Sequence, residues 1–436
     1  MITSGVLTHA RTQGLIGRAN RSQERLKQIL GLLPVDQQKL LSSDKSLDKS
    51  DDKNFLPSPS NLEPLPGGDL NCEEPKYDVK DQKVVNTFNA LLPEYALFHN
   101  EGIQLLQSGQ LNNVRTLTWY CAETYECGGL GTRFRGFMAT LTFAILTNRV
   151  LLFRWDHPSA ENVYLLPNKV DWQYRDYSLK LTESFKDLGL IKRLHLVDER
   201  YKYLIDDFID TLVGTTSHVQ VHYNPIEKLV STLCRIIDNL HNPKLSTFNV
   251  TNMFDVRNYP IVESLSYKFL FKFTRELQVF ANEVRNNLNL YGKKYVAVHL
   301  RTGQFSGSDI KEKAARVQNS LSGVRFAVEC AIKQADKYIG PDAPVVVVSD
   351  SSEMKQTVSK GYSRVVILEN NVLVHVDKSK NISKEGMLGT WQDIIIMAES
   401  HIVVMQPSSF PLISVAMCGI TRSRTKIITA TSKCRP

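Results

Sequence analysis

Short runs rich in Val and Ile alternate with helix-length segments over the last third of the chain. Five runs have the length of strands and lie at Tyr295–Leu300, Pro344–Ser349, Arg364–Leu368, Ile402–Met405 and Lys426–Thr429. The segments between them have helical spacing, and these are Val324–Tyr338, Ser352–Lys360, Thr390–Ser400 and Pro411–Cys418. Apolar strands that alternate with helices are typical of a parallel sheet covered on both faces. We therefore predict a Rossmann-like α/β domain over residues 291–436.

The middle of the chain shows the same alternation in a less regular form. Val114–Tyr120 predicts a strand, Phe134–Leu146 an apolar helix, and Val150–Phe153 a second strand. A strand, a helix and a strand in this order imply parallel pairing. Farther on, Leu, Phe and Val recur at helical spacing, which predicts one long helix over Val262–Leu290. We predict an N-terminal α/β domain over residues 81–290 that includes this linking helix.

The first 80 residues carry few signals of regular structure. Ser42–Lys53 is polar and charged, and Pro57–Gly68 is rich in Pro, Ser and Gly. Such a composition buries too little apolar surface to offset the entropy of ordering the chain. We predict a flexible, stem-like region over residues 1–80, with a short helix near Gln23–Leu33. A tether between an anchor and a folded domain has this composition, and so does any disordered N-terminus.

Composition places the chain among ordinary soluble globular proteins, because 42% of its 436 residues are hydrophobic and 22% are charged. The net charge of +8 fits an anionic ligand, but no dense run of Lys and Arg indicates nucleic-acid binding. The most apolar stretch, Phe134–Phe153, is interrupted by polar residues, and Met1–Asn20 lacks the apolar core of a signal peptide. No membrane anchor is therefore visible in this sequence.

The seven cysteines are widely spaced. Cys121 and Cys127 are close enough in sequence to be bridged, but no pair or cluster has the spacing of a zinc site. We expect neither a metal nor a bound cofactor. Glycosylation sequons at Asn20, Asn249 and Asn381 are weak support for a secretory glycoprotein, because such sequons are frequent by chance.

A glycine-rich segment, Cys127–Gly136, lies between the first strand and helix of the middle region. Its glycines let the backbone approach a ligand, and Arg133 and Arg135 arrive where the helix begins. A helix N-terminus with cations suits a phosphate, because its free N–H groups and its dipole both favour negative charge. The segment matches neither a Walker A loop nor a dinucleotide fingerprint. A plain turn, with both arginines pointing to water, explains it about equally well.

Polar residues follow the predicted strands of the C-terminal domain. Arg301 comes at the end of the first strand, where its fork of donors could bind a diphosphate or form a surface salt bridge. His299, two residues before it, is more often structural than catalytic in such a position. Asp350 follows the next strand and either accepts a hydrogen bond from a nucleoside or caps the next helix.

The end of the fourth strand leads into a strong helix start. Ser408 and Ser409 stand at the N-cap, with Pro411 in the first turn, and they leave hydroxyl and N–H groups free for an anion. Phe410 either stacks on a base or belongs to the core. Asp393 lies among apolar residues of the preceding helix and needs a partner, which guanine donors or a nearby arginine would supply.

Taken in order, these segments resemble the motifs of the fucosyltransferase superfamily that uses GDP-fucose, which includes the α1,6-, α1,2- and protein O-fucosyltransferases. The resemblance runs from about residue 114 to 419. Each motif is weak by itself, and the order makes the set fairly specific. The matching segments are the glycine segment with Leu146–Arg149, then His299–Arg301, Ser349–Ser351, Asp393 and Ser408–Phe410.

The resemblance implies a GT-B fold, in which two Rossmann-like domains with parallel sheets face a central cleft. It implies an inverting, metal-independent glycosyltransferase that moves fucose from GDP-fucose to a glycan or protein hydroxyl, with Arg301 as the catalytic residue. Relatives of this type in eukaryotes work in the Golgi or endoplasmic reticulum, and a cytoplasmic location is the alternative. The implied donor-binding residues are Gly129, Leu130, Gly131, Arg133, Arg135, His299, Arg301, Asp350, Asp393, Ser408, Ser409 and Phe410.

The sequence departs from this family after His299–Arg301. Many relatives carry an acid or a second arginine there, whereas Thr302 and Gln304 occupy these places. The general base is therefore unassigned, and the candidates are Glu126, Asp156 and Asp309. Two alternatives follow: a GDP-sugar-binding protein without catalysis, or a Rossmann-like enzyme that uses another nucleotide.

Overall fold

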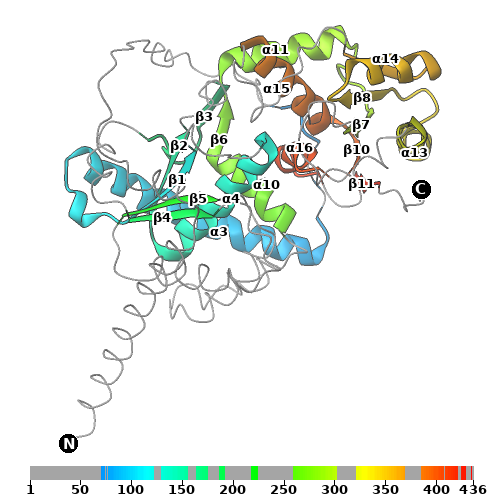
Figure 1. The fold of residues 1–436 in the computed structure, drawn as a ribbon. Helices are drawn as coiled ribbons and strands as arrows, with labels where there is room; N and C mark the ends of the chain where they lie inside the picture. Colours follow the sequence, from blue (N-terminus) through cyan, green and yellow to red (C-terminus); the bar gives the residue numbers. More distant parts are fainter. Residues whose placement is uncertain are drawn as a thin grey trace, which may run out of the picture. The chain divides into compact units, whose positions relative to one another are not determined.

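The computed structural model of the chain describes most residues from Leu70 onward (Figure 1). All of them belong to one compact unit, Asn61–Pro436. The described residues are 70–73, 75, 77–121, 129–155, 164–174, 186–191, 218–223, 259–301, 321–368, 384–406, 408–420, 424–428 and 434. The helix predicted near Gln23–Leu33 lies outside them.

The N-terminal sheet contains four parallel strands in the order β2-β1-β5-β4. The helix α4 (Leu130–Thr147) connects β1 to β2, with Thr116 opposite Val150, so the predicted strand–helix–strand unit is confirmed. α4 begins four residues before the predicted start and ends at Asn148, whose φ of 49° stops the helix. The strands are β1 (Thr116–Cys121), β2 (Val150–Trp155), β4 (Lys186–Ile191) and β5 (His218–Tyr223).

The C-terminal sheet contains five parallel strands in the order β11-β10-β7-β8-β9. Its first strand is central, with the next two strands on one side and the last two on the other, which is the doubly wound arrangement of a Rossmann-like domain. The strands are β7 (Val296–Leu300), β8 (Val345–Ser349), β9 (Val365–Ile367), β10 (Ile402–Met405) and β11 (Thr425–Ile427). The helices between them are α13 (Leu321–Tyr338), α14 (Ser352–Gly361), α15 (Lys384–Glu399) and α16 (Phe410–Cys418).

Both faces of this second sheet are buried, as its continuous apolar strands predict. Val296, Val298 and Leu300 of β7 share a core cluster with residues of α13. Ala297, which points the other way, belongs to a separate cluster with residues of α11 and α15. The predicted α/β class with parallel sheets is therefore confirmed.

The prediction of one helix over Val262–Leu290 is wrong. The segment contains two helices, α10 (Tyr259–Leu270) and α11 (Arg275–Asn287), with the short strand β6 (Phe271–Phe273) between them. β6 pairs antiparallel with β3 (Leu165–Pro167), a partner distant in sequence that helical spacing does not reveal. Thr274 then starts α11 by accepting a hydrogen bond from Leu277 N through its side chain.

The long helix α3 (Val79–Gln107) and the short 3₁₀ turn η1 (Leu111–Asn113) precede the first strand. Pro93 lies inside α3, which masks the helix in the sequence. Phe88 and Leu92 of α3 enter a core cluster that also contains residues of α4, α10, α15 and α16. The two sheets are therefore joined through a shared layer of helices rather than through one linking helix.

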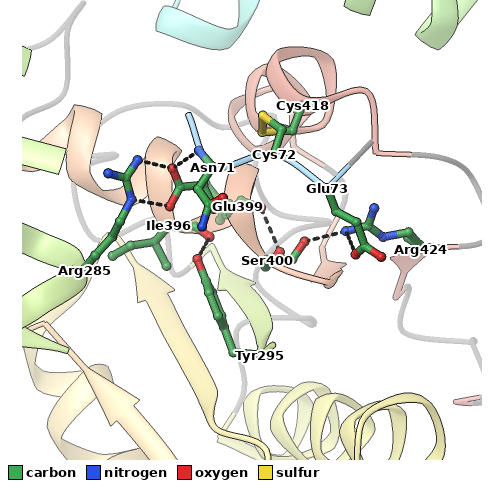
Figure 2. The surroundings of a disulfide bond; sticks show 11 residues. Asn71, Cys72, Glu73, Arg285, Tyr295, Ile396, Glu399, Ser400, Cys418 and Arg424 are labelled. Atoms are coloured by element: carbon green, nitrogen blue, oxygen red, sulfur yellow. Dashed lines mark hydrogen bonds and ion pairs between the residues drawn. A yellow bond between two sulfur atoms is a disulfide. The ribbon is translucent and has the colours of Figure 1, made fainter. Parts of the chain in front are cut away.

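Residues 70–73, which belong to the segment predicted as a stem, contact the C-terminal part of the chain. Cys72 forms a disulfide with Cys418 at the end of α16 (Figure 2). Asn71 N donates to Glu399 Oε1 at 2.8 Å, and Glu73 pairs with Arg424 at 3.3 Å. A second disulfide, which the sequence did not predict, joins Cys330 to Cys434. The suggested bridge from Cys121 involves Cys127, which lies outside the described residues.

None of the helices in the described ranges combines the length and the apolar character that crossing a membrane requires.

Candidate active site

The glycine segment meets the start of α16 by direct backbone contact. A β-carbon placed on Gly131 would lie 2.2 Å from the carbonyl oxygen of Ser409 and 2.7 Å from Phe410 N. Only glycine allows this approach, because real side chains are essentially never found that close. Next to it, the hydroxyls of Thr132 and Ser409 lie 3.3 Å apart. The contact brings together two motifs that the sequence places at opposite ends of the folded chain.

Two helices begin at this contact. Gly129 is the N-cap of α4 and Ser409 is the N-cap of α16, and neither helix receives a side-chain hydrogen bond from its N-cap residue. The predicted helix start at Ser408–Pro411 is confirmed, with Ser408 Oγ accepting from Phe410 N at 3.3 Å. Because each helix N-terminus carries partial positive charge, their meeting favours an anion.

The two arginines of the glycine segment have different surroundings. Arg133 is only 1% exposed, and its guanidinium carbon lies 5.7 Å from the centre of the Trp155 ring. Arg135 donates through Nε to Glu263 of α10 at 3.1 Å. The interpretation that both point to water is therefore wrong. Arg135 anchors α4 to α10, and Leu130 is likewise buried in the core rather than placed for ligand contact through its side chain.

The carboxyl end of β7 lies against the start of α16. The His299 ring is centred 5.7 Å from that of Phe410, which packs partly buried against two core clusters. Burial lowers the pKa of His299 to about 4, although Asp350 opposes the shift, so the imidazole is neutral at pH 7. Its Nδ1 has no hydrogen-bond partner in the part of the chain that the structure describes.

Arg301 is held by both its backbone and its side chain. Its N–H donates to Gln406 Oε1 at 2.7 Å, and its Nη1 lies 3.6 Å from Asp350 Oδ2. Asp350 therefore faces Arg301 at the adjacent strand end. It does not cap α14, because Ser351 does so by accepting from Met354 N at 3.2 Å. The two residues form a charged pair at the edge of the sheet where ligands bind in α/β folds.

Asp393 is buried on α15, with 6% exposure. Burial raises its pKa to about 6, and Asp350 raises it further, whereas the charge of Lys355 lowers it. Lys355 of α14, itself 3% exposed, is a basic residue whose charge favours the ionised form of this carboxyl. The signal for Lys355 was its place on the inward face of α14, where it and Val358 are the buried residues.

Other predicted residues cannot be placed. Glu126, Asp156 and Asp309, the candidate bases, lie outside the described residues, as do Thr302 and Gln304. Within the described ranges, no three His, Cys, Asp or Glu residues are grouped as a metal ion requires. Three further residues were not predicted from the sequence. The side chains of Thr132 and Gln406 contact Ser409 and Arg301, and the charge of Lys355 acts on Asp393.

No protein-family model and no curated protein sequence matches this chain. Among solved structures, a mutant of Arabidopsis thaliana FUT1 in complex with GDP has a TM-score of 0.49 at 13% identity, over 79% of this chain and 80% of that chain. The fucosyltransferase NodZ from Bradyrhizobium has a TM-score of 0.42 at 12% identity, over 69% and 92%. POFUT1 in complex with GDP has a TM-score of 0.35 at 12% identity, over 72% of this chain and 99% of that chain.

The described arrangement suits an anionic ligand at the strand ends. Arg301 supplies a permanent charge, and the starts of α4 and α16 supply oriented backbone dipoles. Asp393 is a buried acceptor beside Lys355, and Phe410 offers a partly buried aromatic ring. A nucleoside diphosphate combines an anion with a base that carries hydrogen-bond donors, so it matches both halves of this cluster.

Proposed function

We propose that this protein is a GDP-fucose-dependent glycosyltransferase that transfers fucose, with inversion, to a hydroxyl of a glycan or protein. The observation that carries the proposal is the backbone contact of Gly131 with Ser409. It places the glycine motif beside the Ser408–Phe410 motif, and Phe410 in turn lies against His299, two residues before Arg301. Residues from the separate sequence motifs thus meet at one edge of the C-terminal sheet.

Charge development explains the chemistry of the site. As the bond between fucose and GDP breaks, negative charge grows on the β-phosphate. Arg301 and the backbone at the starts of α4 and α16 would stabilise that charge in place of water. We expect the transfer to need no metal ion. The acceptor hydroxyl would lose its proton to one of the candidate bases, Glu126, Asp156 or Asp309.

The nucleobase of the donor would be recognised by residues of α14, α15 and α16. An ionised Asp393 can accept hydrogen bonds from the N–H donors of guanine, and Lys355 favours that ionised form. Phe410 is the aromatic group available to pack against the nucleoside. These assignments predict a preference for guanine over uracil nucleotides.

We further propose that the protein acts in the lumen of the Golgi or endoplasmic reticulum. The disulfides Cys72–Cys418 and Cys330–Cys434 support this location, because such bonds persist in oxidising compartments. Mass spectrometry of the protein from its native cell tests the proposal. Glycans on Asn249 and Asn381 would support it, and unmodified sequons with free thiols would contradict it.

A donor screen tests the main proposal. Calorimetry with GDP-fucose, a UDP sugar and GTP should show the strongest binding for GDP-fucose, and acceptor-dependent release of GDP should follow. Arg301→Ala should reduce turnover about 10²–10³-fold, the usual loss for one preorganised donor. Arg325→Ala is the matched control, because Arg325 is exposed on α13.

The outcomes separate the alternatives. Binding of GDP-fucose without turnover on any acceptor would favour a sugar-nucleotide-binding protein, as the departure at Thr302 and Gln304 allows. Preference for a different nucleotide would favour another Rossmann-like enzyme. Unchanged donor binding and turnover in Arg301→Ala would contradict the proposal that Arg301 stabilises the charge on the leaving diphosphate.

A further inference from the structure

Gln406 joins the two polar segments of the candidate active site. It follows β10 directly, and its side-chain oxygen accepts a hydrogen bond from the backbone N–H of Arg301 at 2.7 Å. Gln406 is 4% exposed, and because Arg301 is partly exposed this bond is partly shielded from water. Two positions later the chain reaches Ser408 and the start of α16. One side chain therefore contacts the backbone of Arg301 from the segment that leads to the Ser409 N-cap.

This hydrogen bond takes the place of a backbone hydrogen bond between β7 and β10 just beyond the last paired residues. β7 and β10 pair with Met405 opposite His299, which is the last pair of their ladder. Val296 N donates toward the β8 side, to Pro344 O, and backbone N–H groups alternate sides along a strand. Arg301, an odd number of residues farther on, therefore directs its N–H toward β10. The side chain of Gln406 accepts it where the backbone pairing has ended.

An unmade bond here would be costly. A buried N–H without an acceptor is unfavourable, so the end of β7 would move to find one. Such a movement would carry the Arg301 side chain with it. Misplacement of a catalytic group by about 1 Å lowers rates about 10²-fold.

The acceptor is also electrically neutral. Arg301 already lies 3.6 Å from the carboxylate of Asp350. A second carboxylate at position 406 would compete with a diphosphate for the same guanidinium and repel its charge. An amide provides the acceptor without that competition.

We propose that Gln406 is a positioning residue, which fixes the backbone of Arg301 through its amide oxygen and leaves the Arg301 charge available to the donor diphosphate. The functional half of this inference rests on the proposed function. The structural half, the hydrogen bond to Arg301, can be tested without it.

Two substitutions test separately the hydrogen-bond acceptor at position 406 and the effect of a negative charge there. Gln406→Met keeps the length of the side chain but accepts no comparable hydrogen bond, whereas Gln406→Glu keeps an acceptor oxygen and adds a charge. Amide hydrogen exchange of Arg301, resolved by fragmentation mass spectrometry on the full chain, reports the bond itself. We expect faster exchange at Arg301 in Gln406→Met and near wild-type exchange in Gln406→Glu.

Kinetics with GDP-fucose then report the consequence. We expect Gln406→Met to lower kcat about 10²-fold with a smaller change in the KM of the donor. Gln406→Glu should instead raise the donor KM about ten- to a hundredfold, as like charges several ångströms apart would. Gln278→Met is the control, because Gln278 of α11 is also buried and donates to a backbone carbonyl, that of Phe273, at 3.4 Å. It should lose stability without either kinetic change.

The results have separate meanings. Wild-type exchange at Arg301 in Gln406→Met would overturn the proposal, as would a loss of stability with unchanged kcat. Equal kinetic effects of the Met and Glu variants would refute the argument for a neutral amide. If the wild-type protein binds no GDP-fucose, the proposed function fails, and the exchange result still decides whether Gln406 holds Arg301. If Gln406→Met does not fold, Gln406→Glu provides the test. It should show near wild-type amide exchange at Arg301 together with a raised donor KM, and any other combination would contradict the proposal.

Discussion

The backbone of Gly131 touches the backbone of Ser409 so closely that a β-carbon on Gly131 would lie 2.2 Å from the Ser409 carbonyl oxygen. The obstacle is main chain, which cannot rotate away as a flexible side chain could. Gly131 therefore sets the distance between the starts of α4 and α16. This glycine, which the sequence predicts to lie close to a phosphate, lies close to the start of a neighbouring helix.

Gly131→Ala should force these two helix starts apart. We expect a loss of stability of about 1–3 kcal/mol, the usual cost of overpacking. We also expect weaker donor binding, because the displaced segments carry the proposed anion site. Urea unfolding and calorimetry with GDP-fucose measure the two effects. Gly361→Ala is the control, since a β-carbon there meets nothing within 4 Å, and it should leave both values near wild type.

Asp393 predicts a pH dependence of donor binding. Its pKa is raised to about 6, chiefly by burial, and guanine donors require the ionised form. The affinity for the donor should therefore be highest well above pH 6, where Asp393 is ionised, and should fall as the pH drops through about 6. GDP-fucose is the better probe, because the terminal phosphate of GDP titrates in the same range. Asp393→Asn should bind more weakly and lose this dependence, and an unchanged profile in that variant would exclude Asp393 as the group responsible.

The same carboxyl predicts a trend in stability without ligand. Because the pKa of Asp393 is about 6 in the fold and 3.8 ordinarily, the folded state binds the proton more tightly. The contribution to stability is therefore complete below pH 3.8 and lost as the pH rises through about 6. Thermal unfolding of Asp393→Asn across pH 4–7 should lack this component. A curve parallel to that of the wild type would contradict the prediction.

The disulfide Cys72–Cys418 should support the site as well as the fold. Replacing both cysteines by serine should cost about 2–5 kcal/mol of stability. Since Cys418 ends the helix whose start is at Phe410, donor affinity should fall too. The disulfide Cys330–Cys434 lies in the core cluster of β7 and α13, and its removal should lower stability alone. Equal effects of both pairs on affinity would show that the first has no special link to the site.

The partly buried ion pair of Arg285 and Glu399 should be necessary for the fold. Glu399 also accepts from Asn71 N, so it joins α11, α15 and the segment before α3 (Figure 2). Glu399→Gln leaves a buried guanidinium without its counter-charge, and we expect a loss of about 3–5 kcal/mol in urea unfolding. The exposed Glu353→Gln on α14 should change stability little. A similar small change for both would mean that the pair is not important.

Local sequence patterns predicted the order of strands and helices in the C-terminal region, although α15 begins six residues before its predicted start at Thr390. Val345–Ser349 and Ile402–Met405 are short and largely apolar, and polar residues follow both, so they could be recognised as strands without knowledge of distant partners. The start of α16 could also be predicted, because a serine shortly before Pro411 is typical of the first turn of a helix. By contrast, Phe271–Phe273 continued a helical pattern and became a strand only because Leu165–Pro167 lies beside it.

The class of fold, the alternation of strands and helices, and the residue types that an anionic ligand would need can all be predicted from the amino-acid sequence. These follow from periodicity, burial and turn chemistry, which act between near neighbours in the chain. Which of these residues contact one another depends on the folded chain. Distant segments of the chain come together in four places: Gly131 with Ser409, Arg135 with Glu263, Gln406 with Arg301, and Lys355 with the carboxyl of Asp393, on which its charge acts. Local sequence patterns predict neither these distances nor the burial that shifts the pKa of Asp393.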